Sequence, residues 1–575
     1  MLCGGTLRGL AAAAGMMTAL GVSPAFAQCY STATGLAGDC TAVVPTGVSA
    51  TAFGFNANAT GGAATAYGNG ASANGADATA TGVTSSAQGG GATATGGFSL
   101  ANGAAATATG TGSTAAATAT GESSTAKGPA ATATGADSRA NGDNATATGQ
   151  LSQAVGTSAT ATGQASAANG NFATATGQAS FANGDAATAT GTASIATGAN
   201  ATATGASSNA NGVSATATGQ LSTATGSRAT ATGALSTATG ANATATGGGS
   251  NAFGFAATAT GVVSNAIGTN ATATGAGSVA NGANATATGT SSFASGANAT
   301  ATGQASIANG ATASAFGQGS NATGDATTAI GQASVASATG ATAVGAGARA
   351  TATGAVAVGN NSAATGVNAI AIGNGAVATG SVAVGAFASA ANGGAAFGDG
   401  AVAIGSNSAA LGPNSSATFA NSTAIGNGAT ATAANQVAIG TASNTYKLSG
   451  ITSAASLAAQ VGPTQVVTTD AAGHLAAATF TGQDISTLQS NVTTLQTQMR
   501  QAFEGTAIAI AMGGSALPSD KRFAISANWG TFRGENAMGL SAQMRLSQYV
   551  VLNGGFGAGF AEGGVGGRAG LTVAW

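Results

Sequence analysis

Residues 201–219 read A-T-A-T-G-A-S-S-N-A-N-G-V-S-A-T-A-T-G, and close variants of this stretch recur along most of the chain. Gly205 and Gly219 belong to a first set of glycines that lie fourteen residues apart. Gly212 belongs to a second set, seven residues out of phase. A fixed period over hundreds of residues is typical of a stack of near-identical coils and not of a globular domain. The repeat therefore argues against most enzyme folds.

The repeat extends from about residue 50 to residue 440. After one short step of eleven residues between Gly110 and Gly121, the first-set glycines keep the fourteen-residue spacing as far as Gly373. In A-T-A-T-G the alternation has a period of two, so the alanines share one face of a strand and the threonines the other. Glycine permits the tight corner that follows, and the second glycine set predicts a second corner and a second strand. Two strands and two turns per repeat describe a flattened β-solenoid, or β-roll. Roughly 28 coils with a rise of ~4.8 Å would extend over about 130 Å.

Composition agrees with a thin, repetitive core. Of 575 residues, 96 are Gly, whereas charged residues make up 5% and aromatic residues 4%, too few large side chains for a thick core. Disorder is the alternative for so simple a sequence, but disordered chains are usually rich in charge or proline, and this chain has six prolines. A net charge of −2 provides no basic surface for nucleic acid.

The side chains that replace threonine indicate which face of the coil is packed. Val and Ile occupy the threonine register in the later coils, at Val356, Val358, Ile370, Ile372, Val402 and Ile404. Since Val and Ile lose most by facing water, we expect this face to be packed inside the coil or between chains, with threonine lining the same interior. The alternative is an exposed threonine ladder, which resembles that of ice-binding proteins. A thermal-hysteresis measurement on residues 50–440 would separate the two.

The N-terminus has the features of a secretory signal. Arg8 precedes an apolar stretch from Leu10 to Val22, and A-F-A at 25–27 offers a cleavage site between Ala27 and Gln28. Cys3 would leave with the signal. The mature chain would keep Cys29 and Cys40, either bridged in an oxidising compartment or free, because their spacing does not fix the geometry.

The repeat stops after Gly440, and a heptad pattern follows. The only histidine, His474, has no Asp, Ser or Cys constellation that would indicate chemistry. A seam with alternating spacings of three and four residues consists of Ile485, Leu488, Val492, Leu495 and Met499, and continues to Ala502. Asp484 suits the start of the helix. So short a coiled coil rarely stands alone, so we expect the helix to associate with copies of itself.

The last 55 residues contain four segments in which apolar residues alternate with small or polar ones: 521–532, 536–547, 549–560 and 565–575. Strands of about ten residues with this pattern, at the end of an exported chain, are typical of an outer-membrane β-barrel. Four strands cannot close a barrel, and an open edge in lipid would leave backbone groups unpaired. Three chains would supply twelve strands, whereas two would give eight, too few to enclose helices.

Four motifs in this order resemble the trimeric autotransporter adhesins of the YadA-like family. S-V-A-V-G (381–385), A-V-A-I-G (401–405) and S-T-A-I-G (422–426) are similar to the family's head repeat. N-Q-V-A-I-G-T-A-S-N-T-Y-K-L-S-G-I (435–451) is similar to its neck, and the heptads and the segment from K-R-F-A-I-S-A-N-W-G-T-F to Trp575 resemble its stalk and anchor. The chain departs from the family in its threonine-rich early coils and its very short stalk.

The resemblance implies a mainly β fold. It comprises a trimeric left-handed parallel β-roll head, a short trimeric coiled-coil stalk and a 12-stranded transmembrane β-barrel to which each of three chains gives four strands. The implied segments are a signal peptide (1–27), an N-terminal segment (28–48), the head of 14-residue repeats (49–434), a neck (435–451), a connector (452–482), a coiled-coil stalk and pore helix (483–513) and the barrel anchor (514–575).

The resemblance also implies a function. The chain would be a surface adhesin, exported through its own anchor and attached to host or environmental surfaces or to other copies of itself. Its partners would be two further copies, the outer membrane with its barrel-insertion machinery, and an extracellular surface or matrix ligand that the sequence does not name. We assign no catalytic residue, cofactor or metal. Gly539 and Gly555 would leave room in the pore, and Trp529 and Trp575 would lie in the membrane anchor. The N-A-T sequons at Asn144, Asn200, Asn242 and Asn284 could accept glycans, although the composition of the repeat itself also explains them.

Overall fold

The computed structural model describes residues 47–462, 464–514 and 516–575 of the chain. The predicted signal peptide, its cleavage between Ala27 and Gln28, and the pair Cys29 and Cys40 lie outside the described residues. The chain divides into two compact units at Asn444 and Thr445, and each is described separately.

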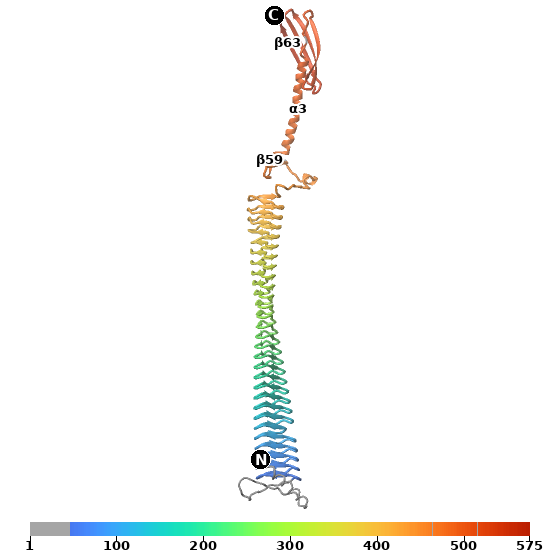
Figure 1. The fold of residues 1–575 in the computed structure, drawn as a ribbon. Coiled ribbons are helices and arrows are strands. Elements are labelled where there is room, and N and C mark those ends of the chain that lie inside the picture. Colours follow the sequence, from blue (N-terminus) through green and yellow to red (C-terminus); the bar gives the residue numbers. More distant parts are fainter. Residues whose placement is uncertain (1–46, 463, 515) are drawn as a thin grey trace, which may run out of the picture. The chain divides into compact units, whose positions relative to one another are not determined.

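The first unit is a β-roll of stacked coils, as the repeat predicts (Figure 1). Each coil contributes a three-residue strand to one parallel sheet and a two-residue strand to a second. The first sheet contains 29 strands, the odd-numbered ones from β1 (Thr51–Phe53) to β57 (Val437–Ile439). The second contains the even-numbered strands from β2 (Asn58–Ala59) to β56 (Thr430–Ala431). We call these the first and second sheets.

Neighbouring strands pair in exact repeat register. In the first sheet β23 (Thr202–Thr204) pairs with β25 (Thr216–Thr218), which places threonine beside threonine and alanine beside alanine. In the second sheet β24 (Asn209–Ala210) pairs with β26 (Thr223–Ala224). Since backbone amides bond both the preceding and the following coil, as Gly219 bonds Thr204 and Thr216 bonds Ala229, the fourteen-residue period of the sequence becomes the spacing of the ladder.

Alanine fills the space between the two sheets. Ala203 and Ala217 of the first sheet and Ala210 and Ala224 of the second are all fully buried. The threonines point away from the interior and are half-buried or exposed. The prediction that threonine, Val and Ile line the interior of the coil is therefore wrong. The corners between the two sheets are single tight turns, and the interior of the described roll holds alanine and serine, with Thr327 as its one branched side chain.

Buried hydroxyl groups exist, and apart from that of Thr327 those in the described roll belong to serine. A serine three residues after the first-set glycine is buried in most coils, for example Ser208. Its hydroxyl donates a hydrogen bond of 2.9 Å to the carbonyl of Gly205 in the same turn. This local bond satisfies the hydroxyl without any partner from another coil.

The two sets of glycines are required for different structural reasons. Gly205 has a φ of +128°, a conformation that other residues rarely adopt, so the first set is needed for the backbone angle. Gly212 has no positive φ, but a Cβ there would overlap the carbonyl of Gly226 in the next coil. Each corner also holds a second residue in the left-handed region, such as Ser207 and Ser214 with φ of 56°. The sequence pattern did not predict these residues, because they are seldom glycine.

The register of the later coils shifts once. Val356 and Val358 lie in β45 (Val356–Val358) and Ile370 and Ile372 in β47 (Ile370–Ile372), in the first sheet as predicted. Val402 instead lies in β52 (Val402–Ala403) of the second sheet, between Ser389 and Ser416, and Ile404 follows it. Two short coils after Gly373 change the phase, so the prediction that these two residues keep the threonine register is wrong.

The second unit begins with short elements and continues into one long helix. Helix α2 spans Ala454–Ala458, and β58 (Gln465–Thr469) and β59 (Leu475–Thr481) form an antiparallel hairpin that the sequence analysis did not predict. Helix α3 spans Gly482–Ala511. No helix among the described residues is both long and apolar enough to cross a membrane.

Four antiparallel strands follow in sequence order: β60 (Phe523–Phe532), β61 (Glu535–Ser547), β62 (Val550–Gly559) and β63 (Val565–Val573). The four predicted strand segments are confirmed within a few residues. The turns at 533–534 and 560–564 lie at one end of this sheet, which we call the hairpin end. The turn at 548–549 and both chain termini of the sheet lie at the other, the terminal end (Figure 1).

Candidate functional site

The only histidine lies in an exposed turn. His474 Nδ1 is 2.8 Å from Asp470 Oδ2, and the other carboxylate oxygen accepts hydrogen bonds from the amides of Ala472 and His474 in the β58–β59 turn. The side-chain hydrogen bond from His474 is the main cause that lowers the pKa of Asp470 to about 2. Both side chains are more than half exposed. The pair closes a hairpin, and the described residues contain no group of His, Cys, Asp and Glu suited to a metal.

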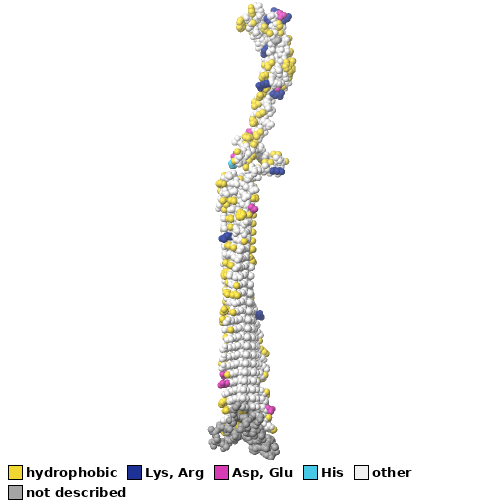
Figure 2. All heavy atoms as spheres, in the orientation of Figure 1, with side chains coloured by type: hydrophobic (Ala, Val, Ile, Leu, Met, Phe, Trp, Pro, Cys, Tyr) yellow, Lys and Arg dark blue, Asp and Glu magenta, His cyan; other side chains and the backbone are white. Residues whose placement is uncertain are grey.

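The two outer faces of the β-roll differ in charge. Within the described roll, no strand of the first sheet contains Asp, Glu, Lys or Arg. Its outward rows are mostly Thr, Val and Ile, with a few larger side chains at Phe53, Tyr67, Phe316, Phe397 and Leu411. The second sheet carries Arg139 in β14 (Arg139–Ala140) and Arg349 in β44 (Arg349–Ala350). The remaining charged residues lie at the turns, scattered singly along the roll (Figure 2). The strands of the first sheet are therefore uncharged, whereas those of the second carry two arginines.

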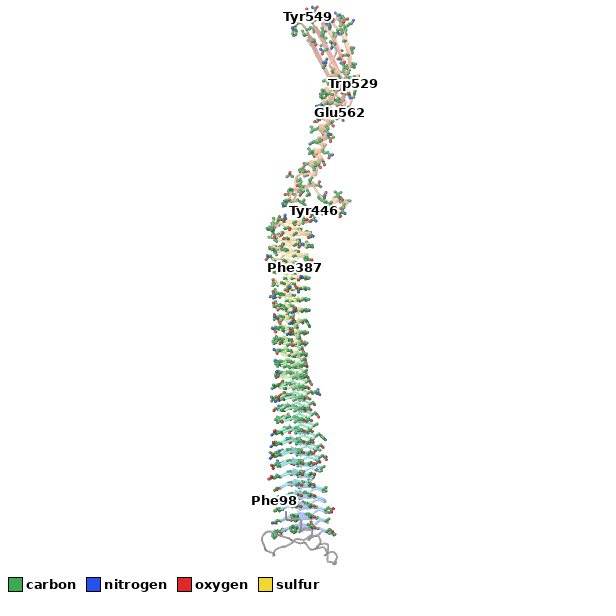
Figure 3. All side chains as sticks on the ribbon, viewed as in Figure 1. Phe98, Phe387, Tyr446, Trp529, Tyr549 and Glu562 are labelled. Atoms are coloured by element: carbon green, nitrogen blue, oxygen red, sulfur yellow. The ribbon has the colours of Figure 1, made fainter. Side chains whose placement is uncertain are left out.

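Apolar side chains also protrude from the second sheet and the turns. Phe181 of β20 (Phe181–Ala182) stacks beside Ile195 of β22 (Ile195–Ala196). The same pair recurs a whole number of coils later, as Phe293 beside Ile307. The turn residues Phe98 and Phe387 are exposed (Figure 3).

Side-chain amides form ladders along the corners of the roll. Gln164 donates to Gln150, and Gln178 donates to Gln164, at 3.3 and 3.2 Å. The sequon residue Asn284 accepts from Asn270 and donates to Asn298, both at 3.1 Å. Stacked amides of this kind tie successive coils together. The four sequon asparagines, Asn144, Asn200, Asn242 and Asn284, all occupy left-handed turn positions.

The anchor sheet has one apolar and one small or polar face, as predicted. The register places Trp529 beside Met538, Ala527 beside Leu540, and Leu540 beside Phe556. These side chains are exposed in the single chain, and Trp575 at the chain end is fully exposed. Trp529 packs against Phe560 near the hairpin end, with ring centroids 5.0 Å apart. Figure 3 shows Trp529 and Glu562 toward that end and Tyr549 at the other.

The opposite face of the sheet holds the C-terminal part of helix α3. Ala507, Ile508, Ala511 and Met512 are buried there. Glycines cross all four strands beneath the helix, at Gly530, Gly539, Gly557 and Gly566. A Cβ at Gly539 would lie 2.7 Å from the carbonyl group of Ala511. The glycines thus form a groove in which the helix backbone approaches the sheet backbone.

Polar contacts fix the helix at the hairpin end. Glu504 is fully buried, and its carboxylate accepts hydrogen bonds of 2.8 to 3.3 Å from the amides of Ala561, Glu562 and Gly564. Arg500, one turn earlier, pairs with Glu535 at 3.2 Å and with Glu562 at 3.1 Å. We call these four residues, Arg500, Glu504, Glu535 and Glu562, the rim contact.

The other faces of α3 remain uncovered. The predicted seam residues are exposed in the single chain: Ile485, Leu488, Val492, Leu495 and Met499. Further along, the face turned away from the sheet contains mostly small residues, namely Ala502, Gly505, Thr506, Ala509, Ile510 and Gly513. Thr481 and Asp484 form a capping box at the start of the helix, and these hydrogen bonds lower the pKa of Asp484.

Comparison with protein families identifies both units. The model of the YadA-like membrane anchor domain matches residues 515–575. The model of the YadA head domain repeat matches overlapping segments that together cover more than half of the chain: 46–71, 126–152, 175–250, 259–285, 287–388 and 396–443. The chain belongs to the YadA-like family of trimeric autotransporter adhesins. It is anchored in the outer membrane and exposes its head at the cell surface.

Among solved structures, the YadA-like chain is similar to the collagen-binding domain of the Yersinia adhesin YadA. The two share 23% identity over 39% of this chain and 79% of the other, with a TM-score of 0.12. A comparison with curated proteins finds no significant match.

The predicted site residues of the YadA-like chain fall into two groups. Gly539 lies directly under α3, whereas Gly555 shares the same face but lies beside Ser541, away from the helix. Trp529 lies on the apolar face, whereas Trp575 follows the end of β63 and is fully exposed. The sequence analysis missed the rim contact. The sequence does contain one indication of this contact: Arg500 and Glu504 are the last charged residues before a stretch of small and apolar residues that continues to Pro518.

Proposed function

We propose that this chain acts as a homotrimeric adhesin whose three anchor sheets form one twelve-stranded barrel around three copies of α3. The observation that carries the proposal is the groove of glycines on the inner face of a four-stranded sheet, with α3 seated in it. Among the described strands, β60 and β63 each pair on one side only. In lipid such edges leave backbone groups unsatisfied, so further copies must supply the missing strands.

The uncovered face of α3 supports three copies. One side of the helix is occupied by its own sheet, and the small residues on the other side allow neighbouring helices to approach closely. The exposed heptad seam continues the same association above the sheet. Twelve strands leave room for three helices, whereas the eight strands of a dimer would leave room only for side chains.

Mass measurement of the detergent-solubilised, unheated protein tests the proposal. We expect a mass close to three times the 52.3 kDa of one chain, less the signal peptide. Multi-angle light scattering with correction for detergent, or native mass spectrometry, would provide the value. A monomer or a dimer would contradict the proposal.

We propose further that the rolls pack together through the first-sheet face. This face is uncharged along its whole described length, and Val and Ile replace threonine in its later coils. The variant Thr216→Lys/Thr230→Lys would place two charges per chain in that interface, where burial of unpaired charge is costly. We expect the head to become sensitive to protease near these coils and its melting temperature to fall by several degrees, measured on the full-length trimer.

A matched control is available on the other sheet. Thr223→Lys/Thr237→Lys introduces the same charges at half-buried threonines of the second sheet, in neighbouring coils. We expect these lysines to be tolerated, since Arg139 and Arg349 occupy equivalent positions. Equal destabilisation by both double variants would contradict the assignment of the interface.

The second sheet and the turns then face outward and provide the adhesive surface. Its singly placed arginines, exposed aromatic residues and amide ladders offer shallow contacts repeated along each roll. Three chains and many coils multiply weak contacts into firm attachment to a surface or matrix ligand, or to other copies of the head. Attachment of a non-adherent bacterium that displays the chain, compared with cells that display the anchor alone, tests this role.

Export follows from the same anchor. The chain would pass through the barrel as hairpins after the insertion machinery has assembled it, and Gly539 and Gly555 would keep the lumen free of side chains. Folding of the coils outside would then oppose return. The head precedes α3 in the chain, and α3 meets the sheet first at the hairpin end. We therefore assign the hairpin end to the cell exterior.

One observation favours a second candidate, an ice-binding function. In the single chain the threonines of the Thr-Ala-Thr strands form regular outward rows on the first-sheet face, the arrangement that the ice-binding alternative requires. In a trimer that face would be covered. A thermal-hysteresis measurement on the purified protein separates the two candidates: we expect no activity, and measurable hysteresis would favour ice binding.

A further inference from the structure

The groove that holds α3 does not by itself set how far the helix enters the anchor. Beneath the helix the sheet presents glycines on all four strands, and the helix presents mainly alanine and other uncharged residues from Gly505 to Gly514. One turn of such a helix resembles the next. Apolar contact has no preferred direction, and the hydrogen bond from Asn528 Nδ2 to the Gly513 carbonyl is long at 3.4 Å, so the groove specifies the axial position of the helix weakly.

The rim contact is different, because it is specific in direction and distance. The Glu504 carboxylate receives three backbone amides from a single turn, the one between β62 and β63. Gly559 and Gly564 make room for it, since a Cβ at Gly559 would overlap the carboxylate. A buried carboxylate is tolerated only where such donors replace water. A shift of the helix by one turn would leave both the carboxylate and the amides without partners.

Arg500 extends the contact to the other hairpin. Its guanidinium bonds Glu535 beside the first turn and Glu562 in the second, so one helix turn connects both hairpins of the sheet. Phe503 lies between Arg500 and Glu504 in the sequence. Its ring packs edge-to-face against Phe532 and lies under the Arg533 guanidinium. Arg500 is half exposed, and exposed ion pairs contribute little. Glu504 is therefore the main determinant.

We propose that Glu504, supported by Arg500, is the positioning residue that fixes the axial register of α3 in the finished anchor. The contact forms only when Glu504 reaches the hairpin end, after the preceding chain has passed. The uncharged stretch behind it slides within the groove until that point. The proposal rests on the proposed function in one respect, namely that α3 occupies the lumen of the barrel.

A disulfide reporter measures the register directly. A Cβ at Gly557 would lie 2.9 Å from Ile508 Cγ2, so in the pair Ile508→Cys and Gly557→Cys a sulfur replaces the crowding methyl group beside the second cysteine. The full-length protein would carry this pair together with Cys29→Ser and Cys40→Ser. Displayed cells are oxidised for increasing times, and mass spectrometry of the linked peptides gives the rate of cross-linking, which reports the fraction of chains in register.

Three further variants are compared in this background. Glu504→Gln keeps the size of the side chain but turns an amide donor toward backbone donors, and Glu504→Ala removes the contact. Gln501→Ala is the matched control, an exposed position one turn away on the same helix. We expect both Glu504 variants to be displayed and trimeric, with cross-linking about tenfold slower than in the control, as for loss of a charged hydrogen bond.

Two results would overturn the proposal. Unchanged cross-linking in Glu504→Ala would show that the groove alone sets the register. Loss of display in both Glu504 variants would show a role in assembly and not one at the end of export. A failure of the proposed function has a different signature, because the parent reporter protein itself would then be monomeric or absent from the surface.

Discussion

Replacement of Gly539 by leucine is expected to abolish surface display of the head. Gly539 lies under α3, and the first carbon of any side chain there would approach the Ala511 carbonyl group to 2.7 Å. Backbone lies on both sides of this contact, so neither partner can yield locally. Overpacking costs about 1–3 kcal/mol at one site, and a trimer would contain three such sites. The measurement is flow cytometry of whole cells with an antibody against the head, together with the heat-resistance of the trimer.

Gly567→Leu is the matched control for this variant. Gly567 lies on the apolar face of β63, where a Cβ would meet only the Gly555 carbonyl at 3.7 Å, an ordinary contact. We expect normal display, because a leucine there would add to the apolar surface. Normal display of Gly539→Leu as well would count against the pore role of the groove.

Ala217→Leu is expected to open the β-roll locally. Ala217 is fully buried between the two sheets, and the neighbouring interior positions are also alanine or serine. A leucine would have to separate the sheets, which the tight corners at Gly212 and Gly219 oppose. We expect a loss of about 1–3 kcal/mol or more and a new protease-sensitive site near residue 217. Limited proteolysis of the displayed protein, followed by mass spectrometry of the fragments, would locate it.

The control uses the same side chain on an outward position. Thr223→Leu lies on the second sheet in an adjacent coil, and Leu100 occupies the equivalent position naturally in β8 (Leu100–Ala101). We expect no new cleavage. If Thr223→Leu were cleaved and Ala217→Leu were not, the assignment of the alanine face to the interior would be wrong.

Periodicity predicted most of the fold, because the spacing of Gly205 and Gly219 specifies a coil and the dyad pattern around Trp529 specifies a membrane strand. It did not predict which face of the coil is inside. That choice depends on the space between the two sheets, which in the described roll holds alanine, serine and one threonine, Thr327.

The contacts of the anchor were only partly predictable. Gly539 was expected in the pore, and the structure places it under α3. Glu504 was missed because its partners are backbone amides of a turn almost sixty residues later, and no side-chain pattern marks such donors. The His474 turn likewise depends on a hairpin that the low regularity of residues 452–482 concealed.

The exact register of the ladder has an evolutionary consequence. Each coil bonds only the coils before and after it, so a gene segment that encodes whole coils can be duplicated or lost without disturbing the rest. The recurrence of the Phe181 and Ile195 pair as Phe293 and Ile307 is the trace that such a duplication would leave. Head length is then a heritable variable that changes in fixed steps, and recombination within the repeat would adjust how far the adhesive surface reaches from the cell.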